Sequence, residues 1–128
     1  MKPFRILVTG SRRWTDTKLL AETLTKAIKD HYSHVIIVHG GCPQGADALA
    51  ELFTQRNNIP TEVHPAKWKI HGTRANFIRN QEMVDAGADL CIGFIMGASL
   101  STKHCVKAAQ KAGIPTTTIT LEAVVPLV

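Results

Sequence analysis

The stretch from His39 to Asp47, with the sequence HGGCPQGAD, contains residue types that bind phosphate in proteins. Its glycines, Gly40, Gly41 and Gly45, allow a backbone cradle, and a helical pattern begins just behind them. Backbone N–H groups at the start of a helix attract anions, phosphates above all. Asp47 would repel a phosphate, so we expect it to bind ribose hydroxyls or to complement the helix dipole. The glycine spacing is neither that of a P-loop nor that of GxGxxG.

A second candidate for anion binding follows the first apolar run of the chain. Gly10 allows the backbone to turn and to approach a ligand closely, and Ser11 offers a hydroxyl donor. Arg12 can hold a phosphate with two parallel hydrogen bonds. The same three residues also fit an ordinary turn with a solvated arginine, and the spacing alone does not separate these readings.

A third group of polar residues lies in the helical pattern from position 74 to 86. Asn76, Asn80 and Met83 share one face at helical spacing, with Arg79 beside them. Amides mixed with methionine on one face indicate the wall of a partly solvated cleft rather than a surface buried in the hydrophobic core. The alternative is a solvated basic face, which is the usual environment of arginine. Trp68, just upstream, fits either a stacked base or the rim of the core.

Other kinds of chemistry have weaker support in the sequence. The six histidines show no HxH or HExxH spacing and the three cysteines form no CxxC pair, so we predict neither a metal nor a cofactor. Ser11 does not lie in a GxSxG sequence, and no cysteine has an obvious base. Only Asp47 and Glu82 remain as weak acid or base candidates.

The composition is that of a soluble globular protein: 128 residues, 45% hydrophobic and 20% charged, predicted to form one domain over residues 1–128. A formal net charge of +5 favours anionic partners, nucleotide and nucleic acid alike, although no Lys/Arg block is present. No apolar run has the length of a membrane span. The odd number of cysteines indicates a reducing compartment. We therefore predict a cytoplasmic protein without membrane contact.

Apolar strand-like runs alternate with helical patterns along the chain. We expect strands at 4–8, 35–39, 61–64, 89–94 and 115–120, helices at 16–30, 46–55, 74–86 and 101–112, and a loop at 66–73. Ser101 or Thr102 is expected to cap the last helix. Regular alternation predicts an α/β fold, a mostly parallel five-stranded sheet with helices on both faces. Loops 10–12, 40–47 and 97–102 would then meet at the carboxyl edge of the sheet.

Taken in order, these stretches resemble the YspA-type branch of the SLOG superfamily. That superfamily also includes the LOG phosphoribohydrolases and the DprA-type DNA-processing proteins. The resemblance extends from Ile6 to Thr118. It depends on TGSR at 9–12, GGCPQGAD at 40–47 and RNQEM at 79–83, with support from HPAKW at 64–68 and AAQKAGIP at 108–115.

The resemblance implies a single Rossmann-like three-layer domain that binds a nucleotide or a nucleotide-derived ligand across the three loops. It assigns one part of the ligand to Gly10, Ser11 and Arg12, phosphate and sugar to Gly40, Gly41, Gly45 and Asp47, and the rest of the pocket to Arg79 and Asn80. The family often has a Gly-Thr pair in the loop at 97–102, where this chain has Ser101 and Thr102. Ser101 could donate a side-chain hydrogen bond in place of the glycine.

Three functions follow as hypotheses. The first is binding of a nucleotide-like small molecule, ADP-ribose-like or a cyclic nucleotide, in a sensor or accessory role. The second is hydrolysis of an N-glycosidic or phosphate bond of a nucleotide. LOG-type hydrolysis is not expected, because Lys103 and His104 stand where LOG enzymes carry a glutamate. The third is binding of single-stranded DNA in the DprA manner. The apolar tail at 121–128 and the resemblance favour a homo-oligomer.

Overall fold

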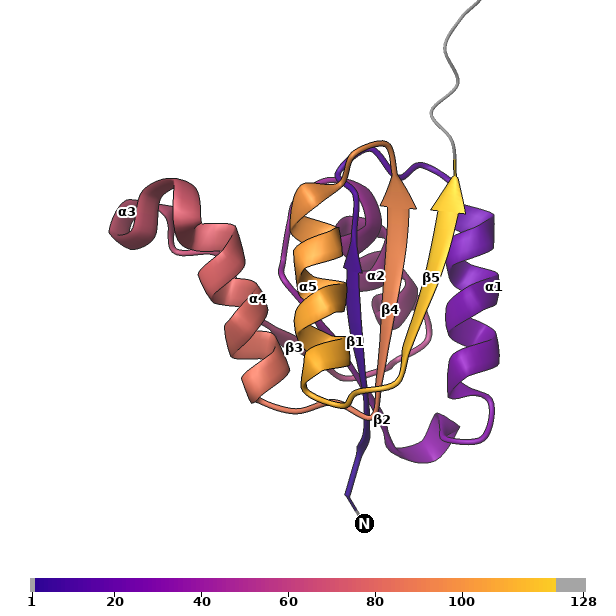
Figure 1. Ribbon diagram of the computed structural model, residues 1–128. Coiled ribbons are helices and arrows are strands. Elements are labelled where there is room, and N and C mark those ends of the chain that lie inside the picture. The colour runs from indigo at the N-terminus through magenta and orange to yellow at the C-terminus, as the bar shows by residue number, and fades with distance from the viewer. Residues whose placement is uncertain (1, 122–128) are drawn as a thin grey trace, which may run out of the picture.

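Five parallel strands form the sheet at the centre of the molecule, in the order β3-β2-β1-β4-β5 (Figure 1). The computed structural model describes residues 2–121, so the predicted contacts of the apolar tail beyond Leu121 lie outside the described residues. The strands are β1 (Phe4–Gly10), β2 (Val35–His39), β3 (Thr61–Val63), β4 (Leu90–Met96) and β5 (Thr116–Leu121). The helices are α1 (Thr17–Ile28), α2 (Gly45–Arg56), α3 (Trp68–His71), α4 (Ala75–Asp85) and α5 (Leu100–Lys111), with short 3-10 helices η1 (Tyr32–His34) and η2 (Gly72–Arg74).

Hydrophobic cores lie on both faces of the sheet because its central strands are apolar on both sides. On β1, Ile6 and Val8 pack into the core that α1 and α2 cover. Leu7, between them, packs into the opposite core, beneath α4 and α5. The predicted α/β, three-layer Rossmann-like fold is therefore confirmed.

The connection after β3 differs from the prediction. Residues 66–73 were expected to form a loop, but α3 and η2 occupy most of this stretch. Gly72 adopts a φ of 58° where α3 passes into η2, a conformation that glycine accepts at low cost. The four-residue α3 is too short to show a helical period in the sequence. Leu52 differs as well: its spacing in the helical pattern at 46–55 predicts a side chain that faces the core, but Leu52 is 38% exposed on α2.

The start of α5 differs from the expected capping. The residue before the helix is Ser99, in a left-handed conformation with a φ of 44°, and the helix begins at Leu100. The Ser99 hydroxyl donates to the Met96 carbonyl at 2.7 Å, which tightens the turn after β4. Ser101 and Thr102 consequently lie in the first turn of α5 rather than ahead of it.

Candidate functional site

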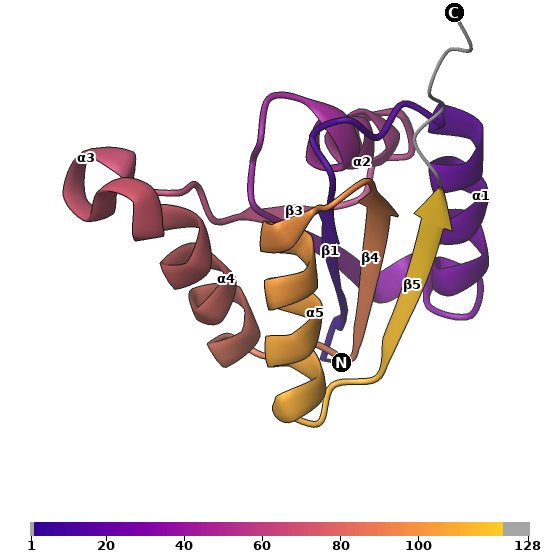
Figure 2. The same cartoon turned by 45° about the horizontal axis from the view of Figure 1, so that its top comes forward.

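A cleft of about 890 Å³ opens at the carboxyl ends of β1, β2 and β4. Figure 2 shows the loops after these strands at one edge of the sheet. From β1 the sheet is extended on one side by β2 and β3 and on the other side by β4 and β5, so the switch point lies between β1 and β4. Open α/β sheets bind ligands at such switch points. The cleft volume lies within the usual range for small-molecule sites. The structure therefore brings the three predicted loops together, while their binding role stays a prediction.

Most of the residues predicted to bind the ligand do line this cleft. Those that line it are Gly10, Ser11, Arg12, Gly40, Gly41, Asp47, Arg79, Asn80, Ser101 and Thr102, together with Asn76 and Met83 of the expected crevice wall. Gly45 does not line it, and Glu82 is exposed on α4 away from it. Arg13 lines the cleft and was not singled out from the sequence, where its only signal was its place next to Arg12.

Arg79 joins two walls of the cleft. Its Nη1 donates to the Gly40 carbonyl at 2.9 Å, its Nη2 to Asn76 Oδ1 at 3.0 Å and its Nε to Asn80 Oδ1 at 2.9 Å. A Cβ atom at Gly40 would collide with this guanidinium group, so a side chain there would displace Arg79 from these hydrogen bonds. All three nitrogens of Arg79 are engaged by the protein. We infer that Arg79 positions the loop after β2 against α4.

Asn80 continues this network to the third loop. It is 1% exposed, and its Nδ2 donates to both the carbonyl and the hydroxyl oxygen of Ser101, at 3.0 and 3.1 Å. A hydroxyl that accepts a hydrogen bond keeps its own hydrogen for another partner. Ser101 can therefore donate a hydrogen bond into the cleft. This is the role expected for the serine that replaces the glycine of the family's Gly-Thr pair.

Asp47 places a buried carboxylate beneath the glycine loop. Its side chain is 6% exposed, and its Oδ2 accepts the Cys42 N–H at 3.2 Å. Burial raises the pKa of Asp47, an effect that the Cys42 N–H and the charge of Arg79 oppose. Among the cleft-lining residues in the described part of the chain, Asp47 carries the sole carboxylate. A buried acid with a raised pKa in a cleft is a feature of functional sites.

His39 supports the same loop from behind. The Gly41 N–H donates to His39 Nδ1 at 3.0 Å, and Nε2 lies 2.8 Å from Glu51 Oε1. Because Nδ1 accepts, the ring proton belongs on Nε2, which donates to the carboxylate. His39 lines a smaller second cavity rather than the cleft, and His64, at 2.8 Å from Glu62 Oε2, lines neither.

Gly45 contributes to the site through packing. It adopts a φ of 70°, and a Cβ atom there would collide with the carbonyl oxygen of Ser11 and the backbone of Arg12. The Ala46 N–H, one residue on, donates to the same Ser11 carbonyl at 3.1 Å. Gly45 thus lets the start of α2 lie directly against the loop after β1. Gly45 makes its close approach to this loop, and its predicted contact with the ligand stays a prediction.

The described residues contain neither a metal-ligand cluster nor a membrane-spanning helix. Across residues 2–121, no three His, Cys, Asp or Glu side chains are grouped so as to hold a metal ion. No described helix combines the length and the apolar character needed to cross a bilayer. The cytoplasmic location and the homo-oligomer stay predictions.

The strand order defines the chain as a Rossmann-like α/β protein, and its cleft lies at the switch point of the sheet. A model of the YspA, cpYpsA-related SLOG family, called YAcAr, matches residues 4–71. The Gene 61 protein of Mycobacterium phage D29 is 41% identical over 116 residues, which cover 87% of this chain and 92% of that protein. The chain belongs to the YspA, cpYpsA-related SLOG family. No solved structure matches it.

Proposed function

We propose that this protein binds a nucleotide or a nucleotide-derived ligand in the cleft at the carboxyl edge of its sheet. The observation that carries the proposal is the charge of the cleft: Arg12, Arg13 and Arg79 line it against one carboxylate, Asp47. The first turns of α2 and α5 reach the same cleft, and helix starts favour anions. Family membership supports nucleotide-related binding or processing in general terms.

Arg12 and Arg13 are the groups best suited to hold the phosphates. Both are exposed, and within residues 2–121 neither guanidinium forms an ion pair or a hydrogen bond with the protein. Ser101 adds a hydroxyl donor from the first turn of α5. Asp47 accepts hydrogen bonds from ribose hydroxyls, which a buried carboxylate does strongly. In this arrangement Arg79 and Asn80 position the walls of the cleft.

A thermal-shift screen of the full chain tests the proposal. The panel contains nucleoside mono-, di- and triphosphates, ADP-ribose and cyclic nucleotides. A ligand at one hundred times its Kd adds about 2.7 kcal/mol of stability, which for a domain of this size raises Tm by roughly 10 °C. Binding should appear for at least one member of the panel. The absence of a shift with every member at millimolar concentration would contradict the proposal.

Hydrolysis of the bound nucleotide is a second candidate, favoured by one observation. Asp47 is a buried carboxylate with a raised pKa inside the cleft, which is what a general acid or base requires. In this alternative Asp47 assists the attack of water on an N-glycosidic or phosphate bond. Chromatography after long incubation distinguishes the two functions. New products that disappear with Asp47→Asn would support an enzyme, and unchanged nucleotide would support a binding protein.

A further inference from the structure

Trp68 is a large aromatic side chain that the folded protein leaves half uncovered. Trp68 is 47% exposed, and it belongs to neither of the two hydrophobic cores of residues 2–121. It lies on α3, which projects beyond α4 and contacts α4 and η2 (Figure 1). Trp68 nevertheless lines the cleft, whereas Ile70 on the same short helix does not. Covering the core therefore does not explain its position.

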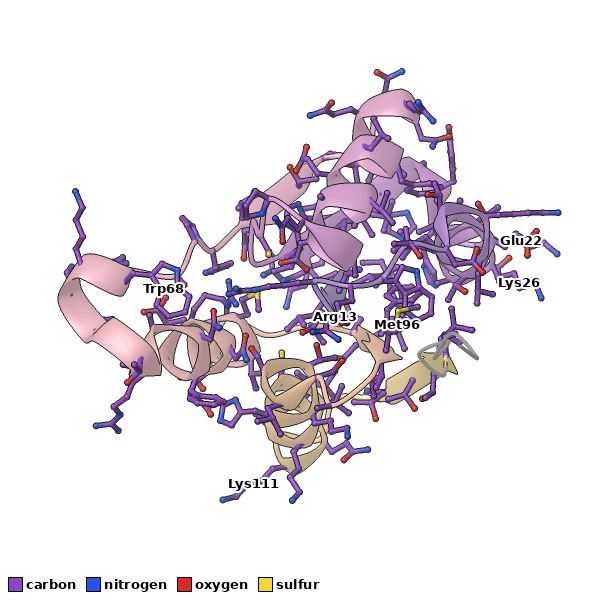
Figure 3. All side chains as sticks on the ribbon, turned by 90° about the horizontal axis from the view of Figure 1, so that it is seen from above. Arg13, Glu22, Lys26, Trp68, Met96 and Lys111 are labelled. Carbon is purple, nitrogen blue, oxygen red and sulfur yellow. The ribbon has the colours of Figure 1, made fainter. Side chains whose placement is uncertain are left out.

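The free positive charge of the cleft lies on another wall. Arg12 and Arg13 belong to the loop after β1, and Arg79 is already engaged by the protein through all three of its nitrogens. Figure 3, which looks down onto this edge of the sheet, shows Trp68 on α3 well apart from Arg13. The cleft thus has a positively charged end and an aromatic end.

We propose that Trp68 is the platform on which the base of the ligand stacks, with the phosphates directed toward Arg12 and Arg13. This inference rests on the proposed function and adds an orientation to it. Every nucleobase has a flat face that stacks on an aromatic ring, and one such contact is worth about 5- to 150-fold in affinity. The ligand class is therefore a nucleoside phosphate with an intact base. Stacking alone selects weakly among bases, so discrimination between purines and pyrimidines should be modest.

Calorimetric titration of the full chain with AMP and with ribose 5-phosphate tests the inference. The two probes share sugar and phosphate and differ only in the base. Trp68→Ala should weaken AMP binding at least tenfold and change ribose 5-phosphate binding less than twofold. Trp68→Phe should restore most of the AMP affinity, because phenylalanine keeps a ring for stacking. Ile70→Ala, on the same helix at 72% exposure and outside the cleft, is the matched control and should change neither affinity.

Tryptophan fluorescence gives an independent readout, because the chain has only two tryptophans. Trp14 is 1% exposed in the core, so the emission that responds to a ligand in the cleft comes from Trp68. AMP should quench the emission of the wild-type protein, and ribose 5-phosphate should not. In Trp68→Phe the quenching by AMP should disappear.

The outcomes separate the inference from the function on which it depends. If the wild-type protein binds neither probe, the proposed function fails for mononucleotides and the orientation fails with it. If both probes bind equally well, or if Trp68→Ala weakens both to the same extent, the cleft binds a sugar phosphate and the stacking role is wrong. If Trp68→Ala changes the oligomeric state but not the AMP affinity, Trp68 is part of a subunit contact and the inference is overturned.

Discussion

At the scale of single residues, the cleft combines buried polar groups that stabilise the fold with a buried carboxylate that lowers its stability. Arg79 and Asn80 are buried, and they are hydrogen-bonded to Gly40 after β2 and to Ser101 at the start of α5. Asp47 is buried as well, and its burial disfavours the charged form. A residue kept at a cost to stability is expected where a ligand uses it. The two kinds of residue should therefore respond differently to mutation.

Replacement of Asp47 by asparagine should stabilise the protein and weaken its binding. Because the pKa of Asp47 is raised in the folded protein from its ordinary value of 3.8, folding favours the protonated acid. The contribution of Asp47 to the free energy of unfolding is therefore largest at low pH and is lost as the pH rises through the folded pKa. Asp47→Asn should raise the free energy of unfolding at pH 7 by about 1 kcal/mol and weaken nucleotide binding about tenfold.

Urea denaturation at pH 4 and pH 7, with calorimetry at pH 7, measures both effects. The stabilisation by Asp47→Asn should be smaller at pH 4 than at pH 7, because more of the wild-type carboxyl is already neutral there. Asp16→Asn serves as the control, since Asp16 caps α1 by accepting the Leu19 N–H outside the cleft. A loss of both stability and affinity in Asp47→Asn would mean that the carboxylate is a structural group.

At the scale of elements, the cleft depends on how closely the start of α2 packs against the loop after β1. Gly45 makes this contact possible, and the Ala46 N–H bond to Ser11 holds it in place. The loop after β1 carries Arg12 and Arg13. A change in the packing of α2 should therefore move Arg12 and Arg13, which we propose hold the phosphates of the ligand.

Gly45→Ala should destabilise the protein more than an alanine at an open glycine. At Gly45 the new methyl group meets the Ser11 carbonyl, and the backbone of the residue must keep a φ of 70°. At Gly87 the backbone has a φ of 87°, but a methyl group there would meet no other atom. We expect Gly87→Ala to cost about 1 kcal/mol and Gly45→Ala about 2–4 kcal/mol. Urea unfolding of both variants measures the difference. Equal losses would show that the helix start can move away from the loop without strain.

Parts of this arrangement could be predicted from the sequence, because they depend on patterns within short stretches of the chain. Carboxyl ends of parallel strands meet at one edge, so glycine-rich loops after three apolar runs predicted the cleft. Asp16 and Thr15 both have the residue type and position to cap the first helix, and in the structure Asp16 caps α1. The short α3 could not be predicted, because one helical turn shows no period. The partners of Arg79 and the steric role of Gly45 arise from contacts between distant segments.

At the scale of the whole molecule, charge and fold act on the same edge. The chain has a formal net charge of +5, and the free arginines of the cleft lie at the switch point of the sheet. A positive protein attracts anions from a distance, which favours the kind of ligand that we propose for the cleft. Binding of single-stranded DNA would also use this charge, but it would weaken steeply with salt because many phosphates are contacted. A small nucleotide should show a shallower dependence.

The most direct test of the central claim is calorimetric titration of the nucleotide that gives the largest thermal shift. The titration compares the wild-type protein with Arg12→Ala, with Arg13→Ala and with Arg56→Ala, an exposed arginine at the end of α2 outside the cleft. Binding in the cleft predicts one site per chain and a loss of about tenfold or more for Arg12→Ala or Arg13→Ala, with Arg56→Ala unchanged. Equal affinities in all four proteins would contradict the account, because the nucleotide would then bind elsewhere.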